Sequence, residues 1–497
     1  MTWPLRLVRL VRPLARSPSP SYSSPARPYH ASPATVSRLV PAAELQFGQP
    51  VHETHPHLLK PTEITPGITA LEYSQRRWRL SDLLPKGSIA IVPGADIKYR
   101  SGAVFYEFHQ DPDFFYLTGF NEPEALAVID KRSSETIFHL FVRPKDPKAE
   151  LWDGARSGEQ AALDVFNADE AKDINKIDKL LPNILKGADK VYTDLPRSFQ
   201  HSTKYARYLS GAAPRPTEGL SKTLQDANLL HTIESLRPLL NKLRVKKSAA
   251  EIVNMRKAGQ LSGRSLTAAM SQSYDKEKDL GTFIDSLFKL NGCDGQAYVP
   301  VIAGGKNALS IHYVRNDDML KPEDMILVDA GGEYGGYITD ITRTWPNAGK
   351  FSSAQRDLYE TVLKVQRTCV SLCREDAKTS LDKIHRIAES GLKDGLKHLG
   401  FDMSGSALET LFPHHVGHYI GLDVHDSPGF PRTEPLTEGH CITIEPGVYV
   451  PNDDRWPAPF RGMGVRIEDS VCIQKESPLI FTTEAVKEVD DIEALRR

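Results

Sequence analysis

Two aspartates in one glycine-rich stretch have the setting of metal ligands. In "MILVDAGGEYGGYITDITRTWP", Asp329 directly follows an apolar run and Asp340 lies between Ile338 and Ile341. A carboxylate in apolar surroundings is costly unless it is paired or binds a metal, so each aspartate requires a compensating charge.

The glycines between these aspartates predict a hairpin. If it turns about Tyr334 and Gly335, Asp329 and Asp340 stand directly opposite each other, with Cβ atoms about 4.5–5.5 Å apart. That separation suits a pair of metal ions about 3.5–4 Å apart. Capping of a turn is the alternative, favoured for either aspartate alone and still slightly favoured for the pair.

Three further segments strengthen the metal hypothesis. Glu445 ends the strand-like "CITIEPGVYV", while Arg466 and Glu468 share one face of the strand-like "GMGVRIEDSVCI". Four ionised carboxylates at about 4 Å repel by about 4 kcal/mol per pair at an effective dielectric of about 20. Two divalent ions would cancel their formal charge. The segment "PHHVGHYIGLDVHD" adds four histidines: His414, His415, His418 and His425.

The elements that must position these residues differ between the two halves of the chain. In the first half, "GSIAIVPG", "ALAVID" and "IFHLFV" predict buried strands and "EYSQRRWRLSDLL" predicts a helix, which together indicate an α/β domain. In the second half, Ser248 and Glu251 form a capping-box pattern that opens a helix to about residue 270. The stretch "SSAQRDLYETVLKVQRTCVSLCRE" predicts a second long helix, and the remainder is typical of antiparallel hairpins.

Length and composition limit the classes of protein. A length of 497 residues predicts two folded domains. A formal net charge of −2 predicts no broad electrostatic surface that would bind nucleic acid. No apolar run of about 18 residues occurs, so no membrane-spanning helix is predicted. The five scattered cysteines predict reduced thiols. Cys369 shares a helical face with Leu358 and Val362, which indicates a buried packing residue.

The N-terminus has a different composition. Residues 1–43 contain arginines, serines and prolines but no Asp or Glu, which is typical of a mitochondrial transit peptide. The alternative is a disordered basic tail. Residues 44–65 predict a solvated linker, in which Pro56 interrupts the zinc-helix pattern that "HETHPH" would otherwise suggest. The predicted domains are then 66–235 and 236–497, and the predicted location is mitochondrial, in the matrix.

The blocks "VDAGGEYGGYITDITRTWP", "HHVGHYIGLDVHD", "TIEPGVYV" and "VRIED" resemble, in order, the signatures of the aminopeptidase P family of pita-bread metallopeptidases. The stretch "DFFYLTGFNEPEALAVI" resembles the N-terminal domain of that family. With the leader, the resemblance is strongest to the mitochondrial, intermediate-cleaving branch. It implies an α/β (α+β) fold: a creatinase/aminopeptidase-P-like α/β domain, then a pita-bread catalytic domain with a curved antiparallel sheet.

The resemblance also implies a role for each matched residue. Asp329 would hold one metal, Asp340 and Glu468 would bridge both, and His418 and Glu445 would complete the second. Oxygen-rich ligation with one imidazole favours two Mn²⁺ ions over zinc. The remaining matches are the substrate-positioning or active-site histidines and two supporting residues: His312, His414, His425, Tyr449 and Arg466. His415 matches no family position and is expected to be structural.

The implied activity is hydrolysis of the first peptide bond by a metal-activated water, with Glu445 shuttling the proton. The substrates are peptide or protein N-termini, and the leader favours single-residue trimming of imported mitochondrial proteins. Strict cleavage of Xaa-Pro bonds is the main alternative. Prolidase activity and a non-catalytic binding protein of the same fold are weaker alternatives. The family also implies a homo-oligomer, a dimer or tetramer.

Overall fold

The chain divides into two compact units, Met1–Leu239 and Leu240–Arg497, of which the computed structural model describes residues 46–194 and 219–496. The predicted transit segment, residues 1–43, lies outside the described residues. Within the described residues, no helix combines the length and the apolar character that crossing a membrane requires.

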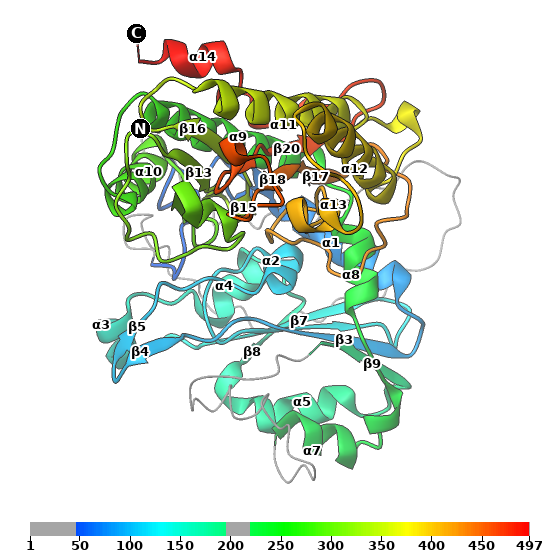
Figure 1. Ribbon diagram of the computed structural model, residues 1–497. Helices are drawn as coiled ribbons and strands as arrows, with labels where there is room; N and C mark the ends of the chain where they lie inside the picture. Colours follow the sequence, from blue (N-terminus) through cyan, green and yellow to red (C-terminus); the bar gives the residue numbers. More distant parts are fainter. Residues whose placement is uncertain (1–45, 195–218, 497) are drawn as a thin grey trace. The chain divides into compact units, whose positions relative to one another are not determined.

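The N-terminal unit is built on a mixed six-stranded sheet (Figure 1). Its two central pairings, β3 with β6 and β6 with β7, are antiparallel, and the outer pairings are parallel. In sheet order the strands are β10 (Ile233–Glu234), β9 (Lys190–Thr193), β3 (Ser88–Pro93), β6 (Leu126–Asp130), β7 (Ile137–Val142) and β8 (Glu170–Asp173). The other elements of this unit are β1 (Glu63–Thr65), β2 (Ile68–Thr69), α1 (Ala70–Leu83), β4 (Tyr99–Ser101), β5 (Val104–Phe105), α2 (Pro112–Thr118), α3 (Pro147–Asp153), α4 (Gly158–Asp164), α5 (Ile177–Leu185) and α7 (Gly219–Asp226).

The strands and the helix predicted for this unit are confirmed. Strand β3 is buried along its whole length, as its continuous apolar sequence requires. Helix α1 begins after Thr69, whose side chain accepts a hydrogen bond from the Glu72 N–H. Such a cap satisfies one of the backbone donors that a helix leaves without a partner at its start.

Residues 46–65 are not a solvated linker, and that expectation is wrong. Val51 and Leu59 are each only 2% exposed. The side-chain amide of Gln49 donates to the carbonyl of Gly119 at 3.0 Å. This segment is therefore packed onto the N-terminal unit, although its proline- and histidine-rich composition resembles that of a linker.

The C-terminal unit combines long helices with short antiparallel sheets. The hydrogen-bonded strand orders are β11-β14-β15, β12-β13-β16, β17-β20-β21 and β18-β19. The strands are β11 (Gly295–Gln296), β12 (Val301–Gly304), β13 (Met325–Asp329), β14 (Gly332–Tyr334), β15 (Tyr337–Ile338), β16 (Thr342–Pro346), β17 (Cys441–Ile444), β18 (Gly447–Tyr449), β19 (Gly464–Arg466), β20 (Asp469–Cys472) and β21 (Leu479–Ile480). The helices are α8 (Arg237–Arg244), which crosses the division between the units, then α9 (Ala249–Met270), α10 (Glu277–Asn291), α11 (Ser353–Ser371), α12 (Leu381–His398), α13 (Ala407–Leu411) and α14 (Val489–Ala494).

The two long helices predicted for this unit are confirmed as α9 and α11. Capping boxes open both: Ser248 with Glu251 for α9, and Ser352 with Gln355 for α11. Their apolar faces join one core with the strands. Cys369 is fully buried in this core, as its helical spacing predicts, and all five cysteines are free thiols.

The hairpin that carries the two aspartates has a register different from the predicted one. It turns at Gly335 and Gly336, which both have positive φ (+60° and +82°), the conformation that glycine adopts without strain. Asp329 consequently pairs with Thr342, two residues beyond Asp340. Because a shift of two residues keeps every side chain on its face of a strand, the two aspartates are diagonal neighbours rather than directly opposed.

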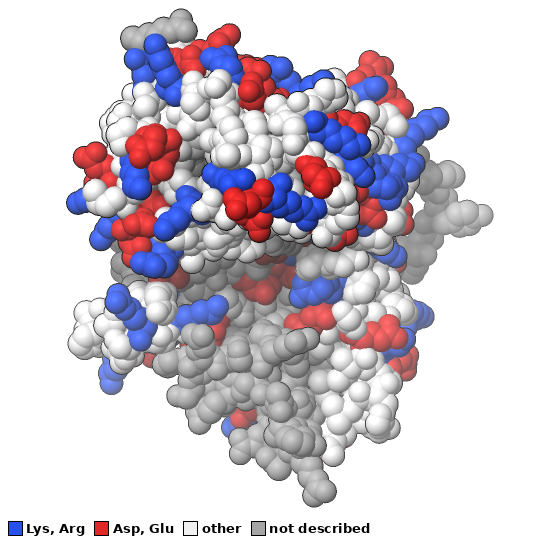
Figure 2. Space-filling view, in the orientation of Figure 1, with Lys and Arg blue, Asp and Glu red and all other residues white. Residues whose placement is uncertain are grey.

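Charges are mixed over the surface of the C-terminal unit. On the face drawn in Figure 2, lysines and arginines lie interspersed with aspartates and glutamates among the described residues. Opposite charges that lie close together weaken each other's field. The described part of this face therefore presents no extended region of a single sign.

Candidate metal centre

Strand ends deliver the four predicted carboxylate ligands. Asp329 is the last residue of β13, and Glu445 directly follows β17. Glu468 lies between β19 and β20. Asp340 precedes β16, and its backbone is fixed by Ser470 of β20, whose hydroxyl accepts from the Asp340 N–H at 3.1 Å and donates to its carbonyl at 2.8 Å.

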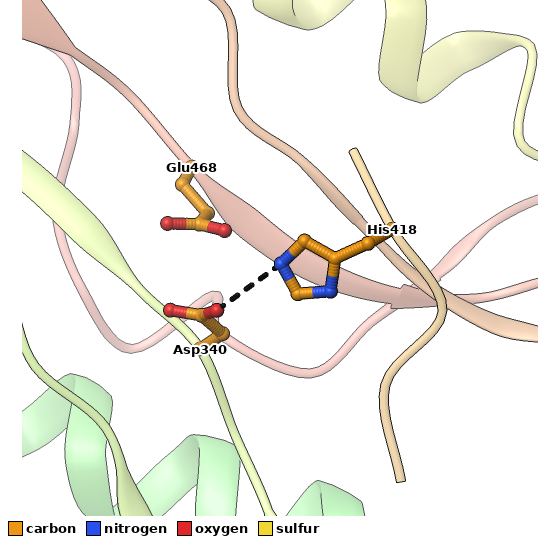
Figure 3. Close-up of side chains that lie close together, drawn as sticks. All are labelled: Asp340, His418 and Glu468. Carbon is orange, nitrogen blue, oxygen red and sulfur yellow. Dashed lines mark ion pairs between the residues drawn. The ribbon is translucent and has the colours of Figure 1, made fainter. Parts of the chain in front are cut away.

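Asp340, His418 and Glu468 form the tightest group. One ligand atom from each lies within 4.8 Å of the others. Their side chains converge from three separate segments, and His418 Nε2 lies 3.4 Å from Asp340 Oδ2 (Figure 3). Two carboxylates and an imidazole at these separations can coordinate one cation.

The other two predicted ligands adjoin this group. Glu445 Oε1 lies 3.6 Å from His418 Nε2. The hydroxyl of Tyr298 lies 2.7 Å from Asp329 Oδ1 and 2.5 Å from Asp340 Oδ1, so it joins the two aspartates. The structure thus brings together all five residues that the sequence indicated as ligands.

The negative charge of this cluster is only partly compensated by the protein. Arg466 donates to Asp329 Oδ2 at 2.6 Å, and the Thr342 hydroxyl donates to Glu468 Oε2 at 2.6 Å. Among the described residues, no hydrogen-bond donor reaches the buried Oε1 of Glu468. Burial, together with the charges of Asp340 and the other carboxylates, raises the pKa of Glu468 well above its usual range.

Protonation of His418 supplies a positive charge beside the carboxylates, as a metal cation would. Burial alone would lower the pKa of His418, but its hydrogen bond to Asp340 and the charge of Glu445 raise it to about 9. Burial and the charge of Asp340 raise the pKa of Asp329 to about 7. If all four carboxylates are ionised, one guanidinium and one imidazolium leave the group with a formal charge of −2, and the raised pKa values of Asp329 and Glu468 reflect this surplus. The oxygen-rich donor set, its surplus charge and the orphaned Glu468 oxygen fit divalent cations.

His414 is tied to the cluster through a tyrosine and an arginine. Its Nε2 lies 2.9 Å from the hydroxyl of Tyr449, which accepts from Arg466 Nη1 at 2.8 Å. Arg466 also donates to the Thr342 hydroxyl through Nε at 2.9 Å. This chain of contacts fixes the orientation of Arg466 toward Asp329.

The other two predicted active-site histidines are exposed. The ring of His425 packs edge-on against His418, with ring centroids 4.4 Å apart. Partial burial of its ring lowers the pKa of His425, and the nearby charge of His418 lowers it further.

His415 points away from this cluster. Its ring stacks on His385 with centroids 4.4 Å apart, and its Nε2 lies 3.3 Å from Asp382 of α12. Its Nδ1 bonds the carbonyl of Gly417 at 2.8 Å. These contacts anchor the histidine-rich segment to α12.

Sequence reasoning missed Tyr298 and Thr342. Tyr298 precedes β12, whose Val301 pairs with Asp329 in the antiparallel sheet. Thr342 pairs with Asp329 on the other side. Both contacts depend on strand register, and the only local signal was a polar hydroxyl residue beside an apolar strand.

Comparisons with known proteins place this site in a family. The Metallopeptidase family M24 matches residues 253–475, and the Aminopeptidase P N-terminal domain matches residues 73–192. Intermediate cleaving peptidase 55 of Saccharomyces cerevisiae is 46% identical over 90% of this chain and 88% of its own length. Human Xaa-Pro aminopeptidase 3 is 38% identical over 90% of each chain. The crystal structure of Icp55 from Saccharomyces cerevisiae, lacking its N-terminal 58 residues, superimposes with a TM-score of 0.79 at 44% identity, covering 88% of this chain and 99% of that one.

This likeness confirms the expected pita-bread catalytic domain and the aminopeptidase-P-like N-terminal domain. As a metallopeptidase the protein uses divalent metal ions and acts on peptides or proteins. The chain belongs to the metallopeptidase family M24, in which it is a metalloaminopeptidase of the aminopeptidase P type.

Proposed function

We propose that this metalloaminopeptidase removes one N-terminal residue from proteins in mitochondria, trimming imported proteins after presequence cleavage. The observation that carries the activity is the convergence of four carboxylates and His418, the proposed ligands, with Arg466, His414 and His425 in one cluster. The acid-free, arginine-rich leader supports import, with the matrix as destination. The likeness to Intermediate cleaving peptidase 55 supports the trimming role.

We propose two Mn²⁺ ions at this site. Asp329 would serve one ion, Asp340 and Glu468 both, and His418 and Glu445 the other. Hard oxygen ligands with a single imidazole suit Mn²⁺ better than zinc. Bound ions would supply Lewis acidity, which polarises the scissile carbonyl and acidifies the attacking water.

The chain's own residues would then bind and orient the substrate and move its protons. His312 would position the peptide, and His414 and His425 would line the site of the tetrahedral intermediate, with His414 fixed through its Nε2 by Tyr449. Glu445 would accept the proton of the attacking water and pass it to the leaving amine. Arg466 would hold Asp329 in place through the 2.6 Å contact.

Strict Xaa-Pro cleavage is the second candidate, favoured by the likeness to human Xaa-Pro aminopeptidase 3. The test uses the protein lacking residues 1–43, supplied with Mn²⁺, and two peptides that differ only in beginning Tyr-Ala or Tyr-Pro. We expect release of tyrosine from the Tyr-Ala peptide at a rate comparable to the Tyr-Pro peptide or faster. Cleavage of the Tyr-Pro peptide alone would replace the trimming proposal with a proline-directed aminopeptidase.

The two weaker alternatives have their own readouts. A prolidase would cleave dipeptides and leave longer peptides intact. A non-catalytic binding protein would bind these peptides without releasing tyrosine and need hold no manganese. Metal content of the purified protein, measured with the same peptides, separates these cases.

We also propose a homo-oligomer. The N-terminal unit leaves several large apolar side chains more than half exposed, which supports contact with another chain. These are Val104, Phe105, Tyr106, Leu151 and Trp152. Light scattering during gel filtration should give a mass near twice or four times 55.3 kDa, and a monomer would contradict the proposal.

A further inference from the structure

A fully buried glutamate, Glu277, lies at the base of the loop that carries His312. It is the first residue of α10. Its Oε1 accepts hydrogen bonds from the Gly304 N–H and from the Asn307 side-chain amide, both at 2.9 Å. Gly304 ends β12, so this oxygen holds the point at which the chain leaves the sheet.

The second oxygen of Glu277 holds the far end of the same loop. Its Oε2 accepts from the hydroxyl of Tyr313 at 2.7 Å and from the Asp318 N–H at 2.9 Å. Tyr313 directly follows His312. One carboxylate therefore joins the start of the loop, the residue next to His312 and the loop's return.

Glu277 is not part of an ion pair with any lysine, arginine or histidine of the described residues. Its charge is stabilised instead by four neutral donors, through charge-assisted hydrogen bonds, which are stronger than bonds between neutral groups. An isolated buried carboxylate is costly without such bonds. The four donors are spread along the loop, at residues 304, 307, 313 and 318. A shift of any of them would break a hydrogen bond to Glu277, so the carboxylate holds the loop in one conformation.

The loop also packs against the active site. Ile311 and Tyr313 pack against an apolar cluster that includes Tyr449, which bonds His414 and Arg466. The loop also lies close to the backbone of Gly464 in β19. A Cβ on Gly464 would lie only 2.5 Å from the carbonyl oxygen of Ala308, which is part of the loop. The position of His312 is thereby coupled to the side chains around the metal site.

We propose that Glu277 is a positioning residue for His312: its carboxylate fixes the 304–318 loop so that the exposed imidazole faces the bound peptide. The proposal rests on the proposed function, in which His312 binds substrate. The contrary view is that Glu277 stabilises the fold in general and has no particular effect on His312.

A double-mutant cycle separates these views. In Glu277→Gln one amide oxygen can still accept from Gly304 and Asn307, but the amide N–H₂ opposes the Asp318 N–H. We expect a KM about tenfold higher with kcat little changed, since a displaced binding group weakens substrate binding. In the His312→Ala background, the same substitution should change KM by less than about twofold.

Glu251→Gln is the matched control. Glu251 is also a buried glutamate at a helix start, bonded by a tyrosine hydroxyl (Tyr337, 2.9 Å) and a backbone N–H (Ser248, 2.7 Å). Its hydrogen bonds to Tyr337 and Ser248 join other segments than the 304–318 loop. We expect its substitution to lower the thermal midpoint without raising KM.

A structural readout is independent of turnover. Hydrogen exchange of a peptide spanning residues 304–318 should be faster in metal-free Glu277→Gln than in the metal-free wild type, and unchanged in Glu251→Gln. If Glu277→Gln does not fold, Tyr313→Phe removes one of the four donors next to His312 and enters the same cycle, with an expected KM increase of about threefold.

The outcomes are distinct. A KM increase of equal size in the presence and absence of His312 would overturn the positioning role while leaving the proposed function intact. Unchanged exchange in the 304–318 peptide would overturn it as well. Wild-type kinetics in His312→Ala would show instead that the proposed role of His312 is wrong, and the inference would be lost with it.

Discussion

Two adjacent buried carboxylates, Glu468 and Asp469, have opposite surroundings. Asp469 Oδ1 accepts from Arg343 and from Thr482, both at 2.7 Å. Its Oδ2 accepts from Gln366 at 2.8 Å and from the ammonium of Lys487. Burial opposes ionisation, yet the charges of Arg343 and Lys487 hold the pKa of Asp469 well below its usual range.

Glu468 receives far less from the protein. One oxygen accepts from Thr342, the other has no donor among the described residues, and the charges of three nearby acids outweigh that of Arg466. Successive side chains along an extended segment point to opposite sides. A difference of one residue therefore separates a charge that the protein neutralises from one that it leaves for a cation.

The comparison teaches how a metal site differs from a structural ion pair. In both settings a carboxylate is buried, so burial alone indicates neither. The distinguishing feature is whether fixed cations of the chain complete the neutralisation. Arg343 helps to neutralise Asp469, and Arg244 and Lys247 neutralise Asp426. At Glu468 the negative charge is in surplus, which supports the proposed place for divalent ions.

The largest expected effect comes from removing the uncompensated carboxylate. Glu468→Ala removes a ligand proposed to be shared by both metals, so kcat should fall about a thousandfold or more. Added Mn²⁺ should stabilise the wild type by about 2.7 kcal/mol at a hundred times its dissociation constant, and this stabilisation should be lost in the variant. Turnover near that of the wild type would contradict the metal assignment.

Removing a compensated carboxylate should affect stability rather than metal binding. Asp426 is buried between Arg244 and Lys247. Asp426→Asn leaves the buried Lys247 without this counter-charge and leaves Arg244 paired only with the half-exposed Asp423, so it should lower the free energy of unfolding by about 3–5 kcal/mol. Metal content per protein should stay at the wild-type value, and urea unfolding of the metal-free protein measures the loss.

The interaction of Asp426 with Arg244 and Lys247 predicts that stability depends on pH. Burial acts to raise the pKa of Asp426, but Arg244 and Lys247 lower it from 3.8 to about 2. A depressed pKa contributes stability above the unfolded value and loses it as the pH falls, here between about pH 4 and pH 2. The wild-type advantage over Asp426→Asn should thus shrink by about 2 kcal/mol across that window. An advantage independent of pH would show that the ionised form of Asp426 contributes nothing.

The sequence indicated most of these residues because their chemistry conflicts with their neighbours. Asp329 after an apolar run and Glu445 at a strand end became candidates when taken together, although either alone would be read as structural, and the capping box at Ser248 marks where a helix begins. These signals are local: each depends on residues within a few positions.

What the sequence did not reveal depends on distant pairing. The hairpin turns at Gly335 and Gly336 instead of one residue earlier, and that difference moved the partner of Asp329 from Asp340 to Thr342. Alternation along a strand fixes the face but not the register. Composition was equally misleading at residues 46–65, where it predicted a solvated linker. The buried apolar side chains of this segment are single residues among prolines and histidines.

We expect the smallest effect from removing the contact between Tyr298 and the two aspartates, which depends on strand pairing. The Tyr298 hydroxyl lies between Asp329 and Asp340 but carries one proton, so it can donate to only one of them at a time. Tyr298→Phe removes that orienting contact and should lower Mn²⁺ affinity or kcat/KM by roughly tenfold, the lower end for groups that orient metal ligands. Tyr337→Phe, which removes a buried hydroxyl of the same hairpin bonded to Glu251, is the control and should leave Mn²⁺ affinity unchanged. Equal losses in the two variants would mean that the hairpin as a whole, and not the shared hydroxyl, sets the position of the two aspartates.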